Sequence, residues 1–141
     1  MKNYVFGIIG AIGSYLAYLL GGWDTGMETL LIILLLDYIT GIIVAGVFRK
    51  SKKTKSGGLN SSIGLMGIFK KVGELILVMV AVLLDRALNL DIVRNGVIIV
   101  LISNEVLSII ENLGLMGVPI PKIIQKAVDL LNDKAGEKEE S

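Results

Sequence analysis

Four long apolar stretches constrain the folding of this 141-residue chain more than any other feature. They cover approximately residues 4–20, 27–48, 72–88 and 95–113. At about 1.5 Å of rise per helical residue, each is long enough to cross the hydrocarbon of a bilayer. Hydrophobic residues make up 53% of the chain and aromatic residues only 6%, a mixture typical of membrane helices. The sequence therefore predicts an all-α integral membrane protein with about four transmembrane helices.

The polar segments divide the chain into a membrane domain, an amphipathic helix and a tail. We expect residues 1–118 to form the membrane domain, with a basic cytoplasmic loop at 49–62. Helical spacing of apolar side chains predicts a short amphipathic helix over 119–132, lying on the inner membrane surface or against a neighbouring helix. Residues 133–141 are predicted to form a charged, disordered tail. The predicted apolar face of the amphipathic helix consists of Ile123, Ile124, Ala127, Leu130 and Leu131.

The basic residues indicate how the chain is oriented. Five of them lie between the second and third stretches: Arg49, Lys50, Lys52, Lys53 and Lys55. An N-terminus in the cytoplasm places this loop and the C-terminal lysines on the cytoplasmic side, with only Arg86 and Arg94 outside. The positive-inside rule therefore predicts that both termini are cytoplasmic. We also expect the loop to attract anionic lipids of the inner leaflet. Nucleic-acid binding is less favoured, because the loop lacks the aromatic partners typical of it.

The first apolar stretch contains small residues at helical spacing. Gly7, Gly10 and Gly13 recur every three residues and predict a groove for the packing of another helix. The alternative is that glycine is simply common in membrane helices. The stretch superficially resembles a signal peptide but lacks a convincing small-x-small cleavage site, so we expect it to be retained.

An acidic residue stands in the middle of the second stretch. A charged Asp37 costs about 2.5 to 3.5 kcal/mol on insertion scales, so we expect it to be protonated or to have a polar partner. Thr40 and Gly41 follow on the same helical face. This small, polar face is therefore predicted to meet protein or water. We hypothesise that Asp37 finds its polar partners in a protein assembly.

The third stretch carries two acids near its ends. Glu74 and Asp85 lie within about 20 degrees of one helical direction. Lys70 and Lys71 precede Glu74 by four and three residues and are expected to pair with it. The alternative to a functional stripe is an interfacial ion pair at Glu74 and an outer-end anchor at Asp85.

The fourth stretch has a ridge of polar side chains. Asn104, Ser108, Glu111 and Asn112 recur at helical spacing, and Glu105 adjoins them. Because lipid cannot satisfy such groups, the ridge is expected to face other helices or an aqueous cavity. Interhelical hydrogen bonding within a bundle is one explanation, and a wall that later lines a hole is the other. The residues predicted for a pore or oligomer interface are Asp37, Gly41, Glu74, Asp85, Asn104, Glu105, Ser108, Glu111 and Asn112.

The residue types present make an enzyme improbable. The chain contains neither Cys nor His, and no phosphate-binding, dinucleotide-binding or zinc motif. We therefore expect no catalytic residue, no metal and no cofactor.

Several segments in order resemble the phage lysis holins, a family that includes clostridial toxin-secretion holins. They are "DYITGIIVA" before a basic loop, "SSIGLMGIFKK", "VAVLLD" and "NEVLSIIENLGLMGVPIP", followed by the amphipathic segment. The resemblance runs from about Leu30 to about Asn132, and the first stretch matches least well. Besides residues named above, the family pattern falls on Ser61, Ser62, Gly64, Gly67, Pro119 and Pro121.

The resemblance implies a homo-oligomer in the bacterial cytoplasmic membrane. Such a protein forms lesions through which an endolysin, or in some relatives a toxin, leaves the cytoplasm and the host cell lyses. Its expected partners are further copies of the chain, membrane lipids and the passenger protein, with no nucleic acid. The alternatives are a narrow ion-conducting channel or small transporter subunit, and an assembly scaffold without a pore.

Overall fold

The computed structural model describes residues 1–140, and this part of the chain is helical without strands. Five α-helices and one π-helical turn follow one another along the chain. They are α1 (Lys2–Leu19), α2 (Thr25–Ile43), η1 (Val44–Phe48), α3 (Ser61–Leu88), α4 (Val93–Leu115) and α5 (Lys122–Glu140). The predicted all-α class is therefore confirmed.

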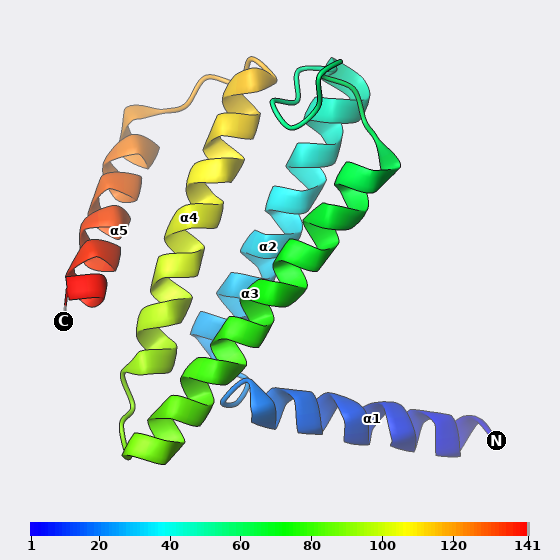
Figure 1. The fold of residues 1–141 in the computed structure, drawn as a ribbon, viewed down its shortest axis with the longest axis vertical. Helices are drawn as coiled ribbons and strands as arrows, with labels where there is room; N and C mark the ends of the chain where they lie inside the picture. The colour runs from blue at the N-terminus through cyan, green and yellow to red at the C-terminus, as the bar shows by residue number, and fades with distance from the viewer. Residues whose placement is uncertain (141) are drawn as a thin grey trace.

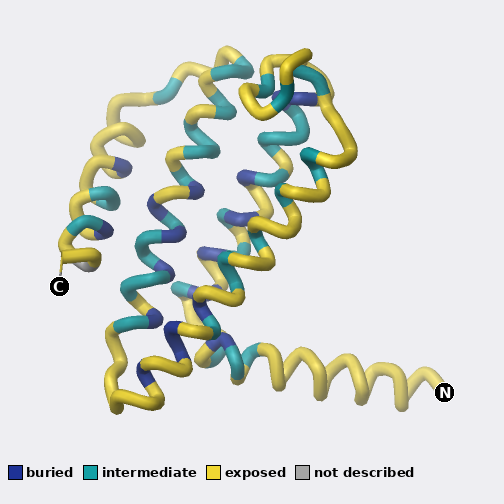
Figure 2. The backbone as a smooth tube through the Cα atoms, in the orientation of Figure 1, coloured by how far each residue is buried: buried dark blue, intermediate teal, exposed yellow. Residues whose placement is uncertain are grey.

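Helices α2, α3 and α4 form an antiparallel bundle, and α5 lies along α4 (Figure 1). Helix α4 is central because it packs against α2, α3 and α5. Buried residues lie along the facing sides of these helices (Figure 2). The apolar core of the bundle consists of Leu20, Met27, Leu30, Leu34, Val78, Ile98 and Leu101.

Helix α1 projects away from the bundle at the end where α3 and α4 are joined (Figure 1). None of its residues is buried, and a Cβ added at Gly7, Gly10 or Gly13 would meet nothing within 4 Å. Its C-terminal turn contacts the bundle through Tyr18, whose ring lies 4.1 Å from the guanidinium carbon of Arg86. The packing role predicted for the three glycines therefore remains a prediction.

Two helical segments are long and apolar enough to cross a membrane, Thr25–Phe48 and Val93–Leu115. Helix α3 is longer than either, but it carries five ionisable side chains: Lys70, Lys71, Glu74, Asp85 and Arg86. Helix α1 is shorter and begins with Lys2 and Asn3. The structure thus gives two segments with the length and apolar character of a membrane span, where the sequence predicts about four.

Helix α3 runs unbroken from the basic loop to the far end of the bundle. Its first residue is Ser61, and its N-cap is Asn60, whose side-chain oxygen accepts a 2.9 Å hydrogen bond from the Ser62 amide. Asn is among the best N-cap residues because its short side chain reaches an unpaired amide. Gly64 and Gly67 do not break the helix but let it approach Tyr38 of α2, with a Cβ at Gly67 falling 3.4 Å from the ring.

Helix α5 differs from its prediction in length and in the face it buries. It continues to Glu140, through the segment predicted to be a disordered tail. The extension is rich in Lys and Glu, which are strong helix formers, and its single alanine, Ala135, is buried. Val128 is also buried, whereas Ile123 and Leu130 of the predicted apolar face are exposed. The face of α5 that packs against α4 is therefore rotated from the predicted apolar face.

The turn between α1 and α2 requires glycine for two reasons. Gly21 and Gly22 have φ values of +81° and +100°, a region that L side chains rarely adopt. At Gly21 a Cβ would also lie 2.6 Å from Cδ of Arg94, whereas at Gly22 it would meet nothing within 4 Å. The two positions therefore share backbone strain and differ in crowding.

We predict that Gly21→Ala destabilises the protein more than Gly22→Ala. Both variants strain the backbone, by about 1 to 3 kcal/mol, but only the first also displaces the Arg94 side chain. The free energy of unfolding, measured in detergent micelles, should fall further for Gly21→Ala by at least about 1 kcal/mol. Equal losses of unfolding free energy in the two variants would show that contact with the Arg94 side chain is not the reason for glycine at position 21.

Candidate functional site

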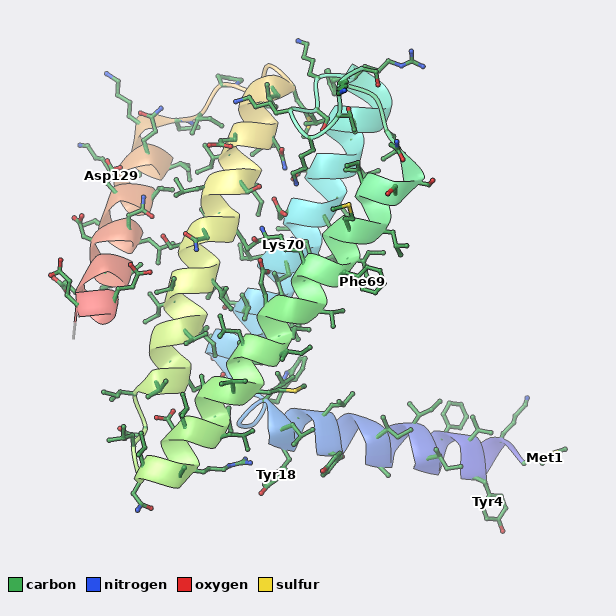
Figure 3. The ribbon with its side chains drawn as sticks, in the orientation of Figure 1. Met1, Tyr4, Tyr18, Phe69, Lys70 and Asp129 are labelled. Atoms are coloured by element: carbon green, nitrogen blue, oxygen red, sulfur yellow. The ribbon has the colours of Figure 1, made fainter. Side chains whose placement is uncertain are left out.

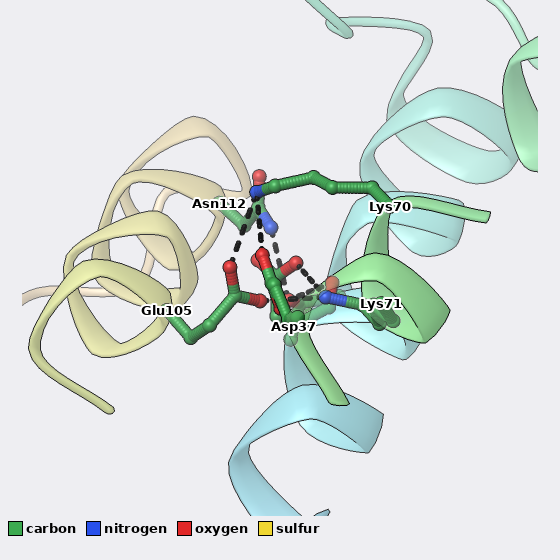
Figure 4. Close-up of polar contacts among 7 residues, drawn as sticks. Asp37, Lys70, Lys71, Glu105 and Asn112 are labelled. Carbon is green, nitrogen blue, oxygen red and sulfur yellow. Dashed lines mark hydrogen bonds and ion pairs between the residues drawn. The ribbon is translucent and has the colours of Figure 1, made fainter. Parts of the chain in front are cut away.

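The ammonium group of Lys71 joins three helices in the middle of the bundle. Its Nζ atom, from α3, lies 2.7 Å from Oδ2 of Asp37 on α2 and 2.6 Å from Oε2 of Glu105 on α4 (Figure 4). Asp37 is 5% exposed and Glu105 is 1% exposed. The acid that the sequence places in the middle of an apolar stretch therefore has a cationic partner within its own chain.

Lys70 extends this set of charges toward the surface. Its Nζ atom lies 3.2 Å from Oε1 of Glu105 and 3.4 Å from Oε1 of Glu74, one turn further along α3. The predicted pairing with Glu74 is confirmed for Lys70, whereas Lys71 pairs across the bundle instead. We call Asp37, Lys70, Lys71, Glu74 and Glu105 together the ion cluster.

The lysines of the ion cluster differ in burial. The side chain of Lys71 is 14% exposed, whereas that of Lys70 is 63% exposed. Figure 3 shows Lys70 between α3 and α4 and the neighbouring Phe69 pointing away from the bundle. An ion pair far from water gains strongly from close approach, but each ion also loses its hydration, so removal of one partner is especially costly. Lys71 is therefore the member whose loss matters most.

The carboxylates of the ion cluster outnumber its ammonium groups by three to two. Among the described residues, Asp37 Oδ1 and Glu74 Oε2 are buried oxygens that have no hydrogen-bond partner. Buried polar atoms of this kind are costly unless water or another group reaches them. The ion cluster therefore has close ion pairs at Lys71, whereas one oxygen of Asp37 and one of Glu74 lack a hydrogen-bond partner.

A second polar layer lies between the ion cluster and the basic loop. Asn112 Nδ2 on α4 donates a 3.0 Å hydrogen bond to Thr40 Oγ1 on α2, and a Cβ at Gly41 would lie 3.8 Å from the same nitrogen. Tyr38 on α2 donates a 3.3 Å hydrogen bond to the carbonyl oxygen of Gly64 on α3. Small residues at these crossings let polar groups of neighbouring helices meet.

A separate polar site fixes the other end of the bundle, and of its residues the sequence analysis singled out only Asp85. The guanidinium of Arg94 is buried and donates to the carbonyl oxygens of Leu20 and Gly22 at 2.6 and 3.1 Å. It also pairs with Asp24 at 2.6 Å. The carboxylate of Asp85 accepts the backbone amide hydrogens of Val93 and Arg94, at 3.0 and 2.9 Å. Asp85 thus caps the start of α4 and lies far along the bundle from the ion cluster.

The structure distributes the predicted polar ridge of α4 between the interior and the surface. Glu105 is buried, Ser108 and Asn112 are half-buried, and Asn104 and Glu111 are exposed. The ridge therefore faces α2 and α3 in part, which agrees with interhelical hydrogen bonding. A pore or oligomer-interface role for these residues stays a prediction, and Asp37 and Glu105 need no second chain for their ionic partner.

Helix α5 makes its own polar contact with α4. The Ser103 hydroxyl is buried and forms a hydrogen bond with the side-chain oxygen of Asn132. The contact lies beside buried Val128 and Ala135. The side chains that fix α5 were not among the predicted site residues, because the sequence gives no sign of which face of α4 it covers.

Ionic side chains inside a helical bundle and aliphatic side chains on its outer faces are typical of membrane-embedded helical proteins. Exposed apolar residues on these faces include Ile32, Leu35, Phe69 and Leu77. In addition, residues 14–133 match the model of the bacteriophage holin family. The chain therefore belongs to the bacteriophage holin family, a non-enzymatic family of membrane proteins. Family membership and the two apolar segments together indicate a membrane location.

Relatives cover nearly the whole chain. An uncharacterized 14.9 kDa protein of the nagH 3′ region of Clostridium perfringens is 40% identical over 134 residues, which are 94% of this chain and 96% of the relative. The uncharacterized protein Lmo0128 of Listeria monocytogenes is 35% identical, covering 96% of this chain and 91% of its own. A probable holin of Bacillus phage phi105 is 30% identical, covering 81% and 82%. No solved structure matches the chain.

We predict that Lys71→Met destabilises the bundle strongly and Lys70→Met does not. The first change leaves two buried carboxylates without their common partner, at a cost of about 3 to 5 kcal/mol. The second removes a mostly exposed ammonium group, whose pairs with Glu74 and Glu105 are weakened by solvent, so we expect it to cost about 1 kcal/mol or less. The check is the free energy of unfolding in detergent micelles. Adding Asp37→Asn and Glu105→Gln to Lys71→Met should recover part of the loss. A similar stability for both single variants would contradict the central role of Lys71.

We predict that Asp24 stabilises the protein at neutral pH and ceases to do so in strong acid. Hydrogen bonds from Arg94 hold the pKa of this carboxyl below its ordinary 3.8. A lowered pKa means that the folded state binds the proton less well, so acid favours unfolding. The stability difference between wild type and Asp24→Asn should therefore be full above about pH 4 and shrink below it. A difference that grows on acidification would contradict the assignment.

Proposed function

We propose that this protein is a holin that oligomerises in the bacterial cytoplasmic membrane and forms lesions through which an endolysin or a toxin leaves the cell. Family membership and 30% identity to a probable phage holin support the proposal. The observation that carries it is the ion cluster, which keeps charged side chains inside a bundle whose outer faces are apolar. A subunit built in this way can accumulate in lipid without conducting ions.

The same cluster supplies a physical route to a lesion. While Lys71 holds Asp37 and Glu105, the charges of the three helices are neutralised largely within one subunit. Moving α3 away from α2 and α4 separates these ions, and hydrocarbon cannot solvate them. Water can solvate them, so the separated ions are stable only on a water-exposed surface that several copies enclose. We propose that lesion formation exchanges internal ion pairs for contact with water in this way.

We also propose a topology with four spans and both termini in the cytoplasm. Helix α3 packs against α4, so the spans of α2 and α4 would carry α3 through the membrane with its charges sheltered between them. Helix α1 leaves the bundle at the end opposite the basic loop. If α1 crosses from that end, its N-terminus reaches the side of the basic loop, as the positive-inside rule requires. Gly7, Gly10 and Gly13 would then provide its packing surface.

A narrow ion conduit is the alternative that uses the same polar residues. Both candidates let ions through, but only a wide lesion lets a folded enzyme escape. Expression in bacteria with separate reporters of ion leak and of release of a cytoplasmic enzyme distinguishes them. Release of the enzyme supports the holin proposal, and ion leak alone overturns it in favour of the conduit.

We predict that Asp37→Asn and Glu105→Gln change the time at which permeabilisation begins. Each substitution weakens the attraction between Lys71 and one neighbouring helix, so the closed bundle should open earlier, with membrane insertion unchanged. The check is the onset of enzyme release at matched expression, with Glu28→Gln, an exposed acid in the first turn of α2, as the control. Wild-type timing in both cluster variants would contradict a gating role of the ion pairs.

A further inference from the structure

A cavity of about 120 Å³ opens between the basic loop and the ion cluster. Its walls come from the end of α2, from η1, from the loop of residues 49–60, from the first half of α3 and from the end of α4. Gly41, Gly64 and Gly67 line it, and their lack of side chains helps to leave the space. Three helices and a loop thus build a pocket at one end of the bundle.

The pocket has two kinds of cation. Lys70 and Lys71 line its inner part and are paired with carboxylates of the ion cluster. Lys52 and Lys53, from the loop, also line it and are exposed, and no ion pair joins either to a carboxylate among residues 1–140. The one further carboxylate in the lining, Glu111, is exposed on α4. The two loop lysines therefore offer free positive charge at the pocket.

Apolar side chains form the remaining wall. Val44, Leu59, Ile63 and Leu115 line the pocket beside the lysines. Val44 begins the last turn of the membrane-type segment Thr25–Phe48, so the pocket lies where that segment ends. In a bilayer this level is occupied by lipid headgroups. A pocket with free ammonium groups and an aliphatic wall at this depth fits an anion attached to a hydrocarbon chain.

We propose that this pocket binds the headgroup phosphate of an anionic phospholipid, held by Lys52 and Lys53, with the start of an acyl chain on the apolar wall. The inference rests on the proposed placement of the basic loop at the inner leaflet. It goes beyond the general attraction of a basic loop for that leaflet, because it assigns the binding to two of its five basic residues. A soluble phosphate shares the anion chemistry but makes no use of the apolar wall.

The loop itself supplies a matched control. Lys50 and Lys55 are exposed basic residues of the same loop, and neither lines the pocket. The variants Lys52→Gln/Lys53→Gln and Lys50→Gln/Lys55→Gln therefore remove the same charge from the same segment. All four side chains lie on the surface, so we expect both variants to fold. Titration of the purified full-length protein in a neutral detergent with short-chain phosphatidylglycerol, and separately with short-chain phosphatidylcholine, measures the affinities without any permeabilisation assay.

The expected result is preference for phosphatidylglycerol and its loss in one variant only. Removing Lys52 and Lys53 should weaken binding about tenfold or more, and removing Lys50 and Lys55 about threefold or less. Equal weakening in the two variants would overturn the pocket in favour of diffuse attraction. Equal affinity for phosphatidylcholine would overturn the anion requirement, and equally strong competition by soluble glycerol phosphate would overturn the lipid assignment. Because the readout is binding, failure here leaves the lesion proposal standing, and failure of enzyme release leaves this pocket standing.

Discussion

The position of one ammonium group determines how the three central helices meet. Lys71 is reached by a carboxylate from α2 and another from α4, and neither acid has room to turn toward solvent. Hydrophobic burial gives helices in lipid little reason to associate, because acyl chains are as apolar as leucine. Directional ionic contacts therefore set the register of α2, α3 and α4. Apolar side chains then fill the space around these ionic contacts.

Polar contacts secure the bundle at two levels, and an apolar core separates them. At one level Lys71 joins the three helices, and at the other Arg94 holds the turn that leads from α1 into α2. Between these levels pack Met27, Leu30 and Ile98. The two levels depend on different chemistry, since the first unites opposite charges in a dry interior and the second mainly satisfies backbone carbonyls at an end. Changes at one level are thus expected to leave the other in place.

The sequence was sufficient for those features that depend on local pattern. Helical periodicity predicted the helical segments, and spacing of four residues predicted the pairing of Lys70 with Glu74. The partner of Lys71 was not predictable, because Asp37 and Glu105 are 34 residues away from it on either side and meet it only through tertiary packing. The role of Arg94 was not predictable either, because the carbonyl oxygens that it binds, those of Leu20 and Gly22, lie more than 70 residues away in the sequence. The end of α5 was misjudged because charge suggests disorder, whereas Ala135 finds a place against α4.

The outer surface of α5 gives the molecule two unlike flanks. On the far side from α5, α3 presents the apolar Phe69, Leu77 and Leu83 to its surroundings. Helix α5 presents the charged Lys126 and Asp133 beside its own exposed apolar residues. The first flank suits hydrocarbon, whereas the charged side chains of the second require water or polar partners. In a bilayer, such a subunit would favour the rotational setting about its long axis that turns α3 toward acyl chains and α5 away from them.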